Sequence, residues 1–231
     1  MIQSWVIENK LLILLCIGTA YSFYWLIDNQ KKLKISHTAA FIISLLHTIV
    51  GVVCVKFFAV MESGFDFENA GNMSIYGAVF ILPLVYYLGA RVSKRDMREV
   101  FDIFTICVLA TLICARFNCI LSGCCLGKCI SGSDTLTWPT RELEIVFYVI
   151  LILFLKNKVY KGKTKGTAYP IYMVSYGTFR FIIEWFREGE AIIFGMLHRA
   201  HLWSILSIVI GSVLLYRMIS KKVKSNKKQK S

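Results

Sequence analysis

Apolar stretches long enough to cross a bilayer recur along almost the whole chain, separated by short charged clusters. A membrane-spanning helix needs roughly 17–25 mainly apolar residues, because the hydrocarbon core of a bilayer is about 30 Å thick. The pattern therefore predicts an all-α integral membrane protein with about seven transmembrane helices. The expected spans are residues 11–28, 36–58, 73–90, 99–120, 141–155, 168–186 and 202–219.

Basic residues gather in every second connection between these spans and in the C-terminal tail. The segments 29–35, 91–98, 156–167 and 220–231 contain three, four, five and six Lys or Arg residues, eighteen of the chain's 27. The segment 62–72 is acidic, and residues 121–140 contain a single lysine. Because basic connections stay on the cytoplasmic side, this alternation predicts an outer N-terminus and a cytoplasmic C-terminus.

Composition agrees with a membrane protein and changes how the charge is interpreted. Of the 231 residues 56% are hydrophobic, and the mean hydropathy is +0.60. The net charge of +13 acts as a topology signal, so we expect no nucleic-acid partner. Residues 1–220 are expected to form one polytopic domain. Residues 221–231 form a Lys-rich cytoplasmic tail that is expected to be disordered.

The first apolar run is followed by the basic sequence NQKKLK rather than by a small-residue cleavage site. We therefore expect it to remain as a span and not to be removed as a signal peptide.

One polar stripe interrupts the sixth apolar span. Tyr176, Arg180, Glu184 and Arg187 follow one another at positions i, i+4, i+8 and i+11, which lie within an arc of about 80° on a helix. Charges within a membrane span usually face a bundle interior or a water-filled cavity. With Arg116 on another span, this stripe predicts a cationic pocket for an anionic lipid. The alternative is that Arg180 and Glu184 only link two helices.

Five of the eight cysteines lie in the segment CARFNCILSGCCLGKC, residues 114–129. Glycines beside them allow a turn that can approach a ligand closely. The spacing C-C-x-x-x-C does not match that of metal or redox motifs, so we expect neither a bound metal nor a cofactor. Cys124 and Cys125 are expected to shape the turn.

Taken in order, several segments resemble the prolipoprotein diacylglyceryl transferase family. YGTFRFIIEWFRE resembles the family's late motif Tyr-Gly-x-x-Arg-Phe-x-x-Glu-Phe-x-Arg, and ARFNCILSGCCLG resembles its signature Gly-Arg-x-Gly-Asn-Phe-x-Asn-Gly-Glu-x-x-Gly. MSIYG, Asp102 and WPTRELE resemble three further family positions. The departures are Tyr76 in place of a family His, Cys119 in place of an Asn and Cys124 in place of a Glu.

The resemblance implies an enzyme of the bacterial cytoplasmic membrane. It would move the diacylglyceryl group of phosphatidylglycerol to a cysteine thiol of a lipobox-bearing prolipoprotein, releasing glycerol 1-phosphate. The implied catalytic residues are Arg180, Arg116, Tyr76 and Glu184, with Tyr76 relaying a proton. The implied substrate-binding residues are Tyr176, Gly127, Glu144, Arg187, Cys119 and Cys124.

Other functions remain open on the sequence alone. A relative that lipidates a different thiol acceptor, such as a secreted peptide, would carry the same lipid-binding residues. An anion or lipid transporter could line its path with the same stripe, and a membrane thiol oxidoreductase could use Cys124, Cys125 and Cys129. His198 and His201 flank the last span, where an interfacial position is expected.

Overall fold

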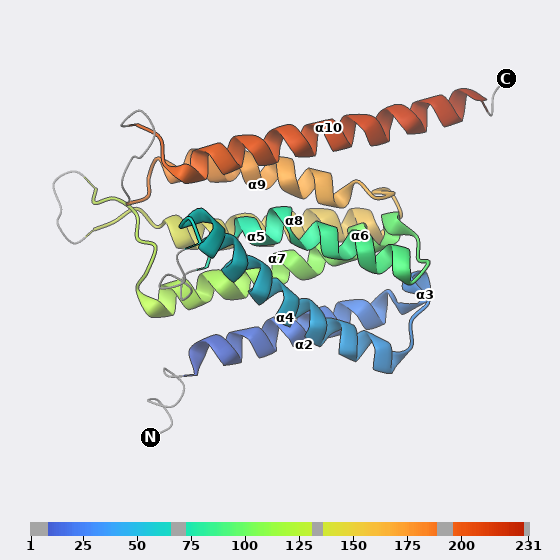
Figure 1. Cartoon of the computed structure of the whole chain (residues 1–231), viewed down its shortest axis with the longest axis horizontal. Coiled ribbons are helices and arrows are strands. Elements are labelled where there is room, and N and C mark those ends of the chain that lie inside the picture. Colours follow the sequence, from blue (N-terminus) through green and yellow to red (C-terminus); the bar gives the residue numbers. More distant parts are fainter. Residues whose placement is uncertain (1–8, 66–72, 131–135, 189–195, 229–231) are drawn as a thin grey trace.

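The fold is a bundle of helices (Figure 1). The computed structural model of the chain describes residues 9–65, 73–130, 136–188 and 196–228. No strand is found in these ranges, which contain only two isolated β-bridges. The helices are α2 (Lys10–Asp28), α3 (Gln30–Leu33), α4 (His37–Glu62), α5 (Tyr76–Phe80), α6 (Leu82–Val92), α7 (Met97–Ser122), α8 (Thr140–Tyr160), α9 (Ala168–Glu184) and α10 (Arg199–Lys228).

Four of these helices are long and apolar enough to cross a membrane: α2, α4, α7 and residues 199–220 of α10. Many large apolar side chains on them point outward, among them Leu46, Ile49 and Val53 of α4. An exposed apolar surface of this kind suits contact with lipid. The all-α membrane fold is therefore confirmed, and every expected span coincides with a helix or a helix pair.

Helix α7 is the centre of the bundle. In the most apolar 18-residue stretch of α7, 72% is buried inside the protein, whereas the corresponding share is 17–28% for the other three long apolar helices. Helix α7 packs against α2, α6, α8 and α9 (Figure 1). The indole nitrogen of Trp25 on α2 donates to the carbonyl oxygen of Ile103 on α7 over 3.0 Å. This packing buries Arg116, which is 4% exposed, whereas Phe117 and Leu121 nearer the end of α7 are exposed.

The third expected span is divided into α5 and α6. Pro83 stands in the first turn of α6 and has no backbone N–H to donate to the preceding turn. The helical path is consequently interrupted at Ile81, between the two helices. The break leaves Tyr76 at the start of α5.

The C-terminal tail differs from our expectation. Residues 221–228 continue α10 as a helix, so the prediction of disorder was wrong for them, and residues 229–231 lie outside the described ranges. Extending a helix by one residue is much easier than nucleating a new one, and lysine is a good helix former. A helix already formed by the apolar part of α10 therefore extends into polar sequence.

Close backbone packing holds α9 beside α10. A Cβ atom added at Gly177 would lie 2.8 Å from the backbone oxygen of Ser204, so any side chain there would separate the two helices. Near the N-terminus of α9, Asp102 of α7 accepts hydrogen bonds from Thr164 and Gly166 in the preceding connection and from Ala168, the first residue of α9. These contacts fix the position of α9 and hence of Arg180.

Candidate active site

A cavity of 590 Å³ opens at the end of the bundle where α7 and α9 end and α5 and α10 begin. Its lining is both apolar and charged. The polar and charged side chains that line it include Tyr76, Arg116, Asn118, Cys119, Cys125, Tyr176, Arg180, Glu184, Arg187, His198 and Arg199. The structure thus brings Arg116 and Arg180 to one cavity, as the sequence predicted.

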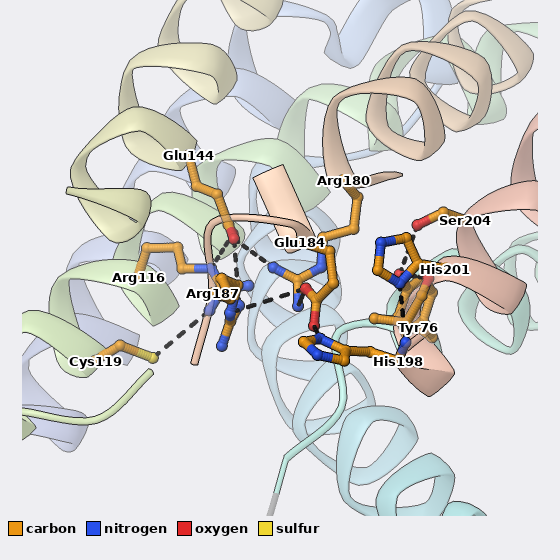
Figure 2. A network of polar contacts seen from close by, with 11 residues as sticks. Tyr76, Arg116, Cys119, Glu144, Arg180, Glu184, Arg187, His198, His201 and Ser204 are labelled. Carbon is orange, nitrogen blue, oxygen red and sulfur yellow. Dashed lines mark hydrogen bonds and ion pairs between the residues drawn. The ribbon is translucent and has the colours of Figure 1, made fainter. Parts of the chain in front are cut away.

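Glu144 of α8 lies behind this cavity and pairs with three arginines (Figure 2). Arg116 forms an ion pair with one carboxylate oxygen, while Arg180 and Arg187 approach the other at 2.6 and 3.4 Å. Glu144 is 1% exposed and does not line the cavity. It therefore orders three guanidinium groups from below and leaves their remaining N–H groups for a ligand.

Glu184 is the second carboxylate of the network. Its Oε2 lies 2.7 Å from Arg180 Nη2 and 3.9 Å from Arg187 Nε, and its Oε1 lies 3.1 Å from His198 Nδ1. Three guanidinium groups therefore meet two carboxylates, which leaves this described cluster with a formal charge of +1. A net positive charge in a largely buried cluster favours an anionic ligand.

Arg187 reaches the site by a route that the stripe did not predict. Helix α9 ends at Glu184, so the expectation that one helix carries Arg187 was wrong. Beyond the helix, Arg187 forms an antiparallel bridge with Gly127, and Lys128 N donates to the Phe186 carbonyl over 2.8 Å. This pairing, rather than helical periodicity, turns the Arg187 side chain back toward Glu144.

Gly127 also lets this segment approach the residues just before α8 closely. A Cβ atom at this position would lie 2.2 Å from the backbone oxygen of Trp138, which no side chain tolerates. Gly127 does not line the cavity, so its predicted role in substrate binding is indirect at most. The glycine lets the 123–130 turn, the start of α8 and the end of α9 meet.

Two tyrosines border the cavity in different states. The Tyr76 hydroxyl donates to the Ala200 carbonyl over 2.8 Å and lies 3.0 Å from Ser204 Oγ. The Tyr176 hydroxyl is buried and has no hydrogen-bond partner among the described residues. Tyr176 is therefore free to donate to a ligand oxygen, whereas the Tyr76 proton is already engaged.

The cysteine-rich turn forms one wall of the site. Cys119 and Cys125 line the cavity, and Arg116 Nη1 lies 3.9 Å from Cys119 Sγ. The pKa of the Cys125 thiol lies below its ordinary value, because Cys119 hydrogen-bonds to it and the positive charges of Arg187 and Arg116 are close. Cys124 is exposed and does not line the cavity, although its thiol approaches the carbonyl of Cys119.

His198 is the residue that the sequence reasoning missed. We expected an interfacial position, but it is 9% exposed, lines the cavity and contacts Glu184 (Figure 2). Its backbone N–H also donates to His201 Nδ1 over 3.0 Å. A signal was available in the sequence, since a His at the edge of a charged span is a natural partner for an acid.

Comparison with known proteins identifies the family to which this site belongs. The family model described as prolipoprotein diacylglyceryl transferase matches residues 11–217. The chain belongs to this family. The matched range includes every residue that lines the cavity, from Leu11 to Ala200.

Curated relatives bear the name phosphatidylglycerol–prolipoprotein diacylglyceryl transferase. The relative from Clostridium perfringens, whose name ends in transferase 2, is 30% identical over 166 residues, which are 66% of this chain and 64% of the relative. Another from Clostridium tetani is 26% identical over 158 residues, or 62% of this chain and 64% of the relative. One from Clostridioides difficile is 24% identical over 238 residues, with 93% and 92% covered. The chain thus spans slightly under two thirds of the length of the Clostridium perfringens and Clostridium tetani relatives.

Proposed function

We propose that this chain moves the diacylglyceryl group of phosphatidylglycerol to the cysteine thiol of a prolipoprotein and releases glycerol 1-phosphate. The observation that carries the proposal is the set of three arginines, ordered by one buried carboxylate, at a cavity of 590 Å³. The names of its family relatives support the same substrates.

The arginines bind the lipid phosphate in this proposal. Arg180 and Arg116 are held by Glu144, and Arg180 is also held by Glu184, so their orientation is set before the lipid enters. Tyr176 donates its free hydroxyl to a phosphate oxygen. Preorganised donors of this kind stabilise charge that develops in the transition state without reorganising.

The bond changes follow from the anionic leaving group. The acceptor sulfur forms a bond with the terminal glyceryl carbon of the lipid, and the bond between that carbon and the phosphate oxygen breaks. The electron pair stays on the phosphate oxygen, which gains negative charge beside Arg180 and Arg116. Glycerol 1-phosphate then leaves through the open end of the cavity.

The acceptor thiol must lose its proton before it attacks, because the thiolate is the nucleophile. We assign the proton to His198. Its Nδ1 donates to Glu184 in the neutral tautomer, which leaves Nε2 as the acceptor, and the imidazolium that forms is stabilised by the same carboxylate. Tyr76 is the weaker candidate, since its proton is engaged with Ala200.

Replacing His198 tests this assignment. His198→Ala should lower lipid transfer by about 10²–10⁴-fold, the usual contribution of a positioned general base. Added imidazole should restore part of the activity, because the small base can enter the space that the side chain leaves. His47→Ala, in the same bundle but bonded to Tyr86 and away from the cavity, is the control. Loss of activity without any imidazole rescue would contradict a proton-transfer role.

We further propose that the chain crosses the membrane seven times with its N-terminus outside, so that this chemistry takes place at the outer face of a bacterial cytoplasmic membrane. The basic connections 29–35, 91–98 and 156–167 gather at the end of the bundle opposite the cavity (Figure 1). That separation supports the orientation inferred from the positive-inside rule.

Cysteine labelling in intact cells tests the orientation. In a variant whose native cysteines are replaced, Lys163→Cys should resist a membrane-impermeant maleimide, and Lys128→Cys should react with it. Both positions are exposed, so access to them depends on the side of the membrane. Labelling at residue 163 with protection at residue 128 would reverse the topology.

The reaction itself is tested with purified protein. Labelled phosphatidylglycerol and a lipobox peptide should yield glycerol phosphate and a lipidated peptide together. A matched peptide with serine in place of cysteine should yield neither. Turnover with an unrelated cysteine peptide, but not with the lipobox peptide, would assign the protein to a different acceptor.

A further inference from the structure

Three cysteine sulfurs converge at the wall of the cavity. The Sγ atoms of Cys119, Cys124 and Cys125 all lie within 4.8 Å of one another, although the three residues belong to a helix end and the turn after it. The C-C-x-x-x-C spacing of Cys124, Cys125 and Cys129 did not suggest a metal site, and Cys119 was not part of that pattern. The folded backbone therefore brings together three thiols whose positions in the sequence do not form a recognised metal motif.

The local backbone explains the convergence. Helix α7 ends at Ser122, and Gly123 follows in the left-handed region with φ of 67°. Cys125 also has a positive φ, 59°, which costs a residue with a side chain about 1 kcal/mol or more. Arg141 Nη1 donates to the carbonyl oxygens of both Cys119 and Cys124 and so holds the turn in this shape.

We propose that Cys119, Cys124 and Cys125 bind Zn²⁺ as three thiolates and leave a fourth position for the thiol of the acceptor. This inference rests on the proposed function. Three protein ligands with one open position are typical of catalytic zinc sites, whereas structural sites have four. Cys119 and Cys125 line the lipid cavity, so a fourth ligand on that side would meet the bound lipid.

The geometry is within reach of tetrahedral zinc. A Zn–S distance of about 2.3 Å implies sulfur atoms about 3.8 Å apart in a regular tetrahedron. Sulfur atoms already within 4.8 Å of one another need only small side-chain rotations to reach that separation. Cys124 is exposed, so an ion can reach the cluster from solvent.

The charge of the surroundings also fits. Three thiolates and one divalent ion carry a charge of −1, and a fourth thiolate makes it −2. Arg116 Nη1 lies 3.9 Å from Cys119 Sγ, and Arg187 also lines the cavity. These two arginines can therefore compensate the negative charge of the zinc–thiolate complex. A thiolate-rich zinc site beside arginines is therefore better compensated than one in an apolar wall.

The step balances without any redox partner. The acceptor thiol gives its proton to His198 and its sulfur to the fourth zinc position, displacing water. Zinc keeps the sulfur deprotonated at neutral pH, because a coordinated thiol loses its proton. The sulfur then bonds to the glyceryl carbon and becomes a thioether, which is a poor ligand for zinc and leaves. The zinc ion thus holds the thiolate that forms once His198 has taken the proton.

Metal content of the full-length protein tests the site. Purified, reduced protein treated with Zn²⁺ and freed of excess should retain about one zinc per chain, as one tetrahedral site requires. Cys119→Ser and Cys125→Ser should lose it, while Cys129→Ser, a free exposed cysteine outside the cluster, should keep it. Zinc well below one per chain, or zinc that survives Cys125→Ser, would overturn the proposal.

Cobalt tests the open position. Co²⁺-loaded protein should show the visible bands and the thiolate-to-metal charge-transfer band of a tetrahedral thiolate site. A cysteine peptide should shift these bands, and the matched serine peptide should not. Bands that do not shift when the cysteine peptide is added would show that the metal does not bind the acceptor thiol and would refute acceptor binding. Neither readout uses phosphatidylglycerol, so zinc-bound protein without lipid transfer would contradict the function alone, and active protein free of zinc would contradict the zinc site alone.

Discussion

Arg180→Ala should lower lipid transfer by about 10²–10³-fold, the usual loss on removing a preorganised donor to developing charge. Arg180 is the only described arginine that pairs with both carboxylates of the network at 2.7 Å or less, and it lines the cavity. The substitution removes the donor, while Glu144 keeps Arg116 and Arg187 and Glu184 keeps His198. The measurement is turnover of labelled phosphatidylglycerol at matched membrane abundance.

Related substitutions separate charge from geometry. Arg180→Lys should recover little, because an ammonium cannot bond two carboxylates and a phosphate through a planar fork. Arg187→Ala should be milder, since its contacts with Glu144 and Glu184 are 3.4 and 3.9 Å long. Arg91→Ala serves as the control, because it removes an exposed arginine of α6 that contacts the ring of Tyr87 and does not line the cavity. Near-normal turnover by Arg180→Ala would reduce the stripe to a link between helices and remove the main physical support for the function.

The charged stripe was predictable because its members lie on one helix. Arg180 and Glu184 are four residues apart on α9, and periodicity alone places them on one face. The long apolar segments likewise predicted the helices. In a bilayer, a single segment can pair all its backbone N–H and C=O groups only by forming a helix. Arg116 was expected at the same cavity because it is a further charge within a span and because two motifs resemble those of one family, and it does line that cavity.

Glu144 shows what the sequence could not predict: the resemblance named this residue as substrate-binding, but neither its three partners nor its position behind the cavity. Its partners stand 28, 36 and 43 residues away on other segments, and the sequence does not state which faces of α7, α8 and α9 meet. The same holds for His198, whose contact with Glu184 depends on how the chain returns into α10. The cysteine cluster depends on two positive φ angles, and no spacing rule encodes them at Cys125.

Arg187 illustrates a different kind of failure. The expected helix was continued by three residues too far, since apolar and aromatic residues after Glu184 suit a helix as well as a turn. The bridge between Arg187 and Gly127 decides the structure there, and it joins segments 60 residues apart. Tertiary pairing thus placed the side chain at the predicted site although the predicted helix had ended.

Glu144→Gln should be the most damaging single change to the fold. The variant keeps the shape of the side chain but leaves three guanidinium groups, of which those of Arg116 and Arg180 are buried, with one carboxylate, Glu184, instead of two. Breaking a buried ion pair from one side typically costs about 3–5 kcal/mol. For a chain of this size, that cost corresponds to a fall in Tm on the order of 10 °C. Thermal unfolding in detergent, followed by tryptophan fluorescence, measures it.

Glu142→Gln is the matched control, because Glu142 lies one half-turn away on α8, is 46% exposed at its side chain and pairs only loosely with Arg141 at 3.6 Å. It should leave Tm within about 1–2 °C, as surface pairs contribute little. Adding phosphatidylglycerol should raise the Tm of Glu144→Gln more than that of the parent, since the lipid phosphate then supplies the missing negative charge. An equal rise in both proteins would mean that the phosphate does not bind at the three arginines. A Tm unchanged by Glu144→Gln would mean that water, rather than Glu144, balances their charge, and the cavity would then lack the preorganisation on which the mechanism depends.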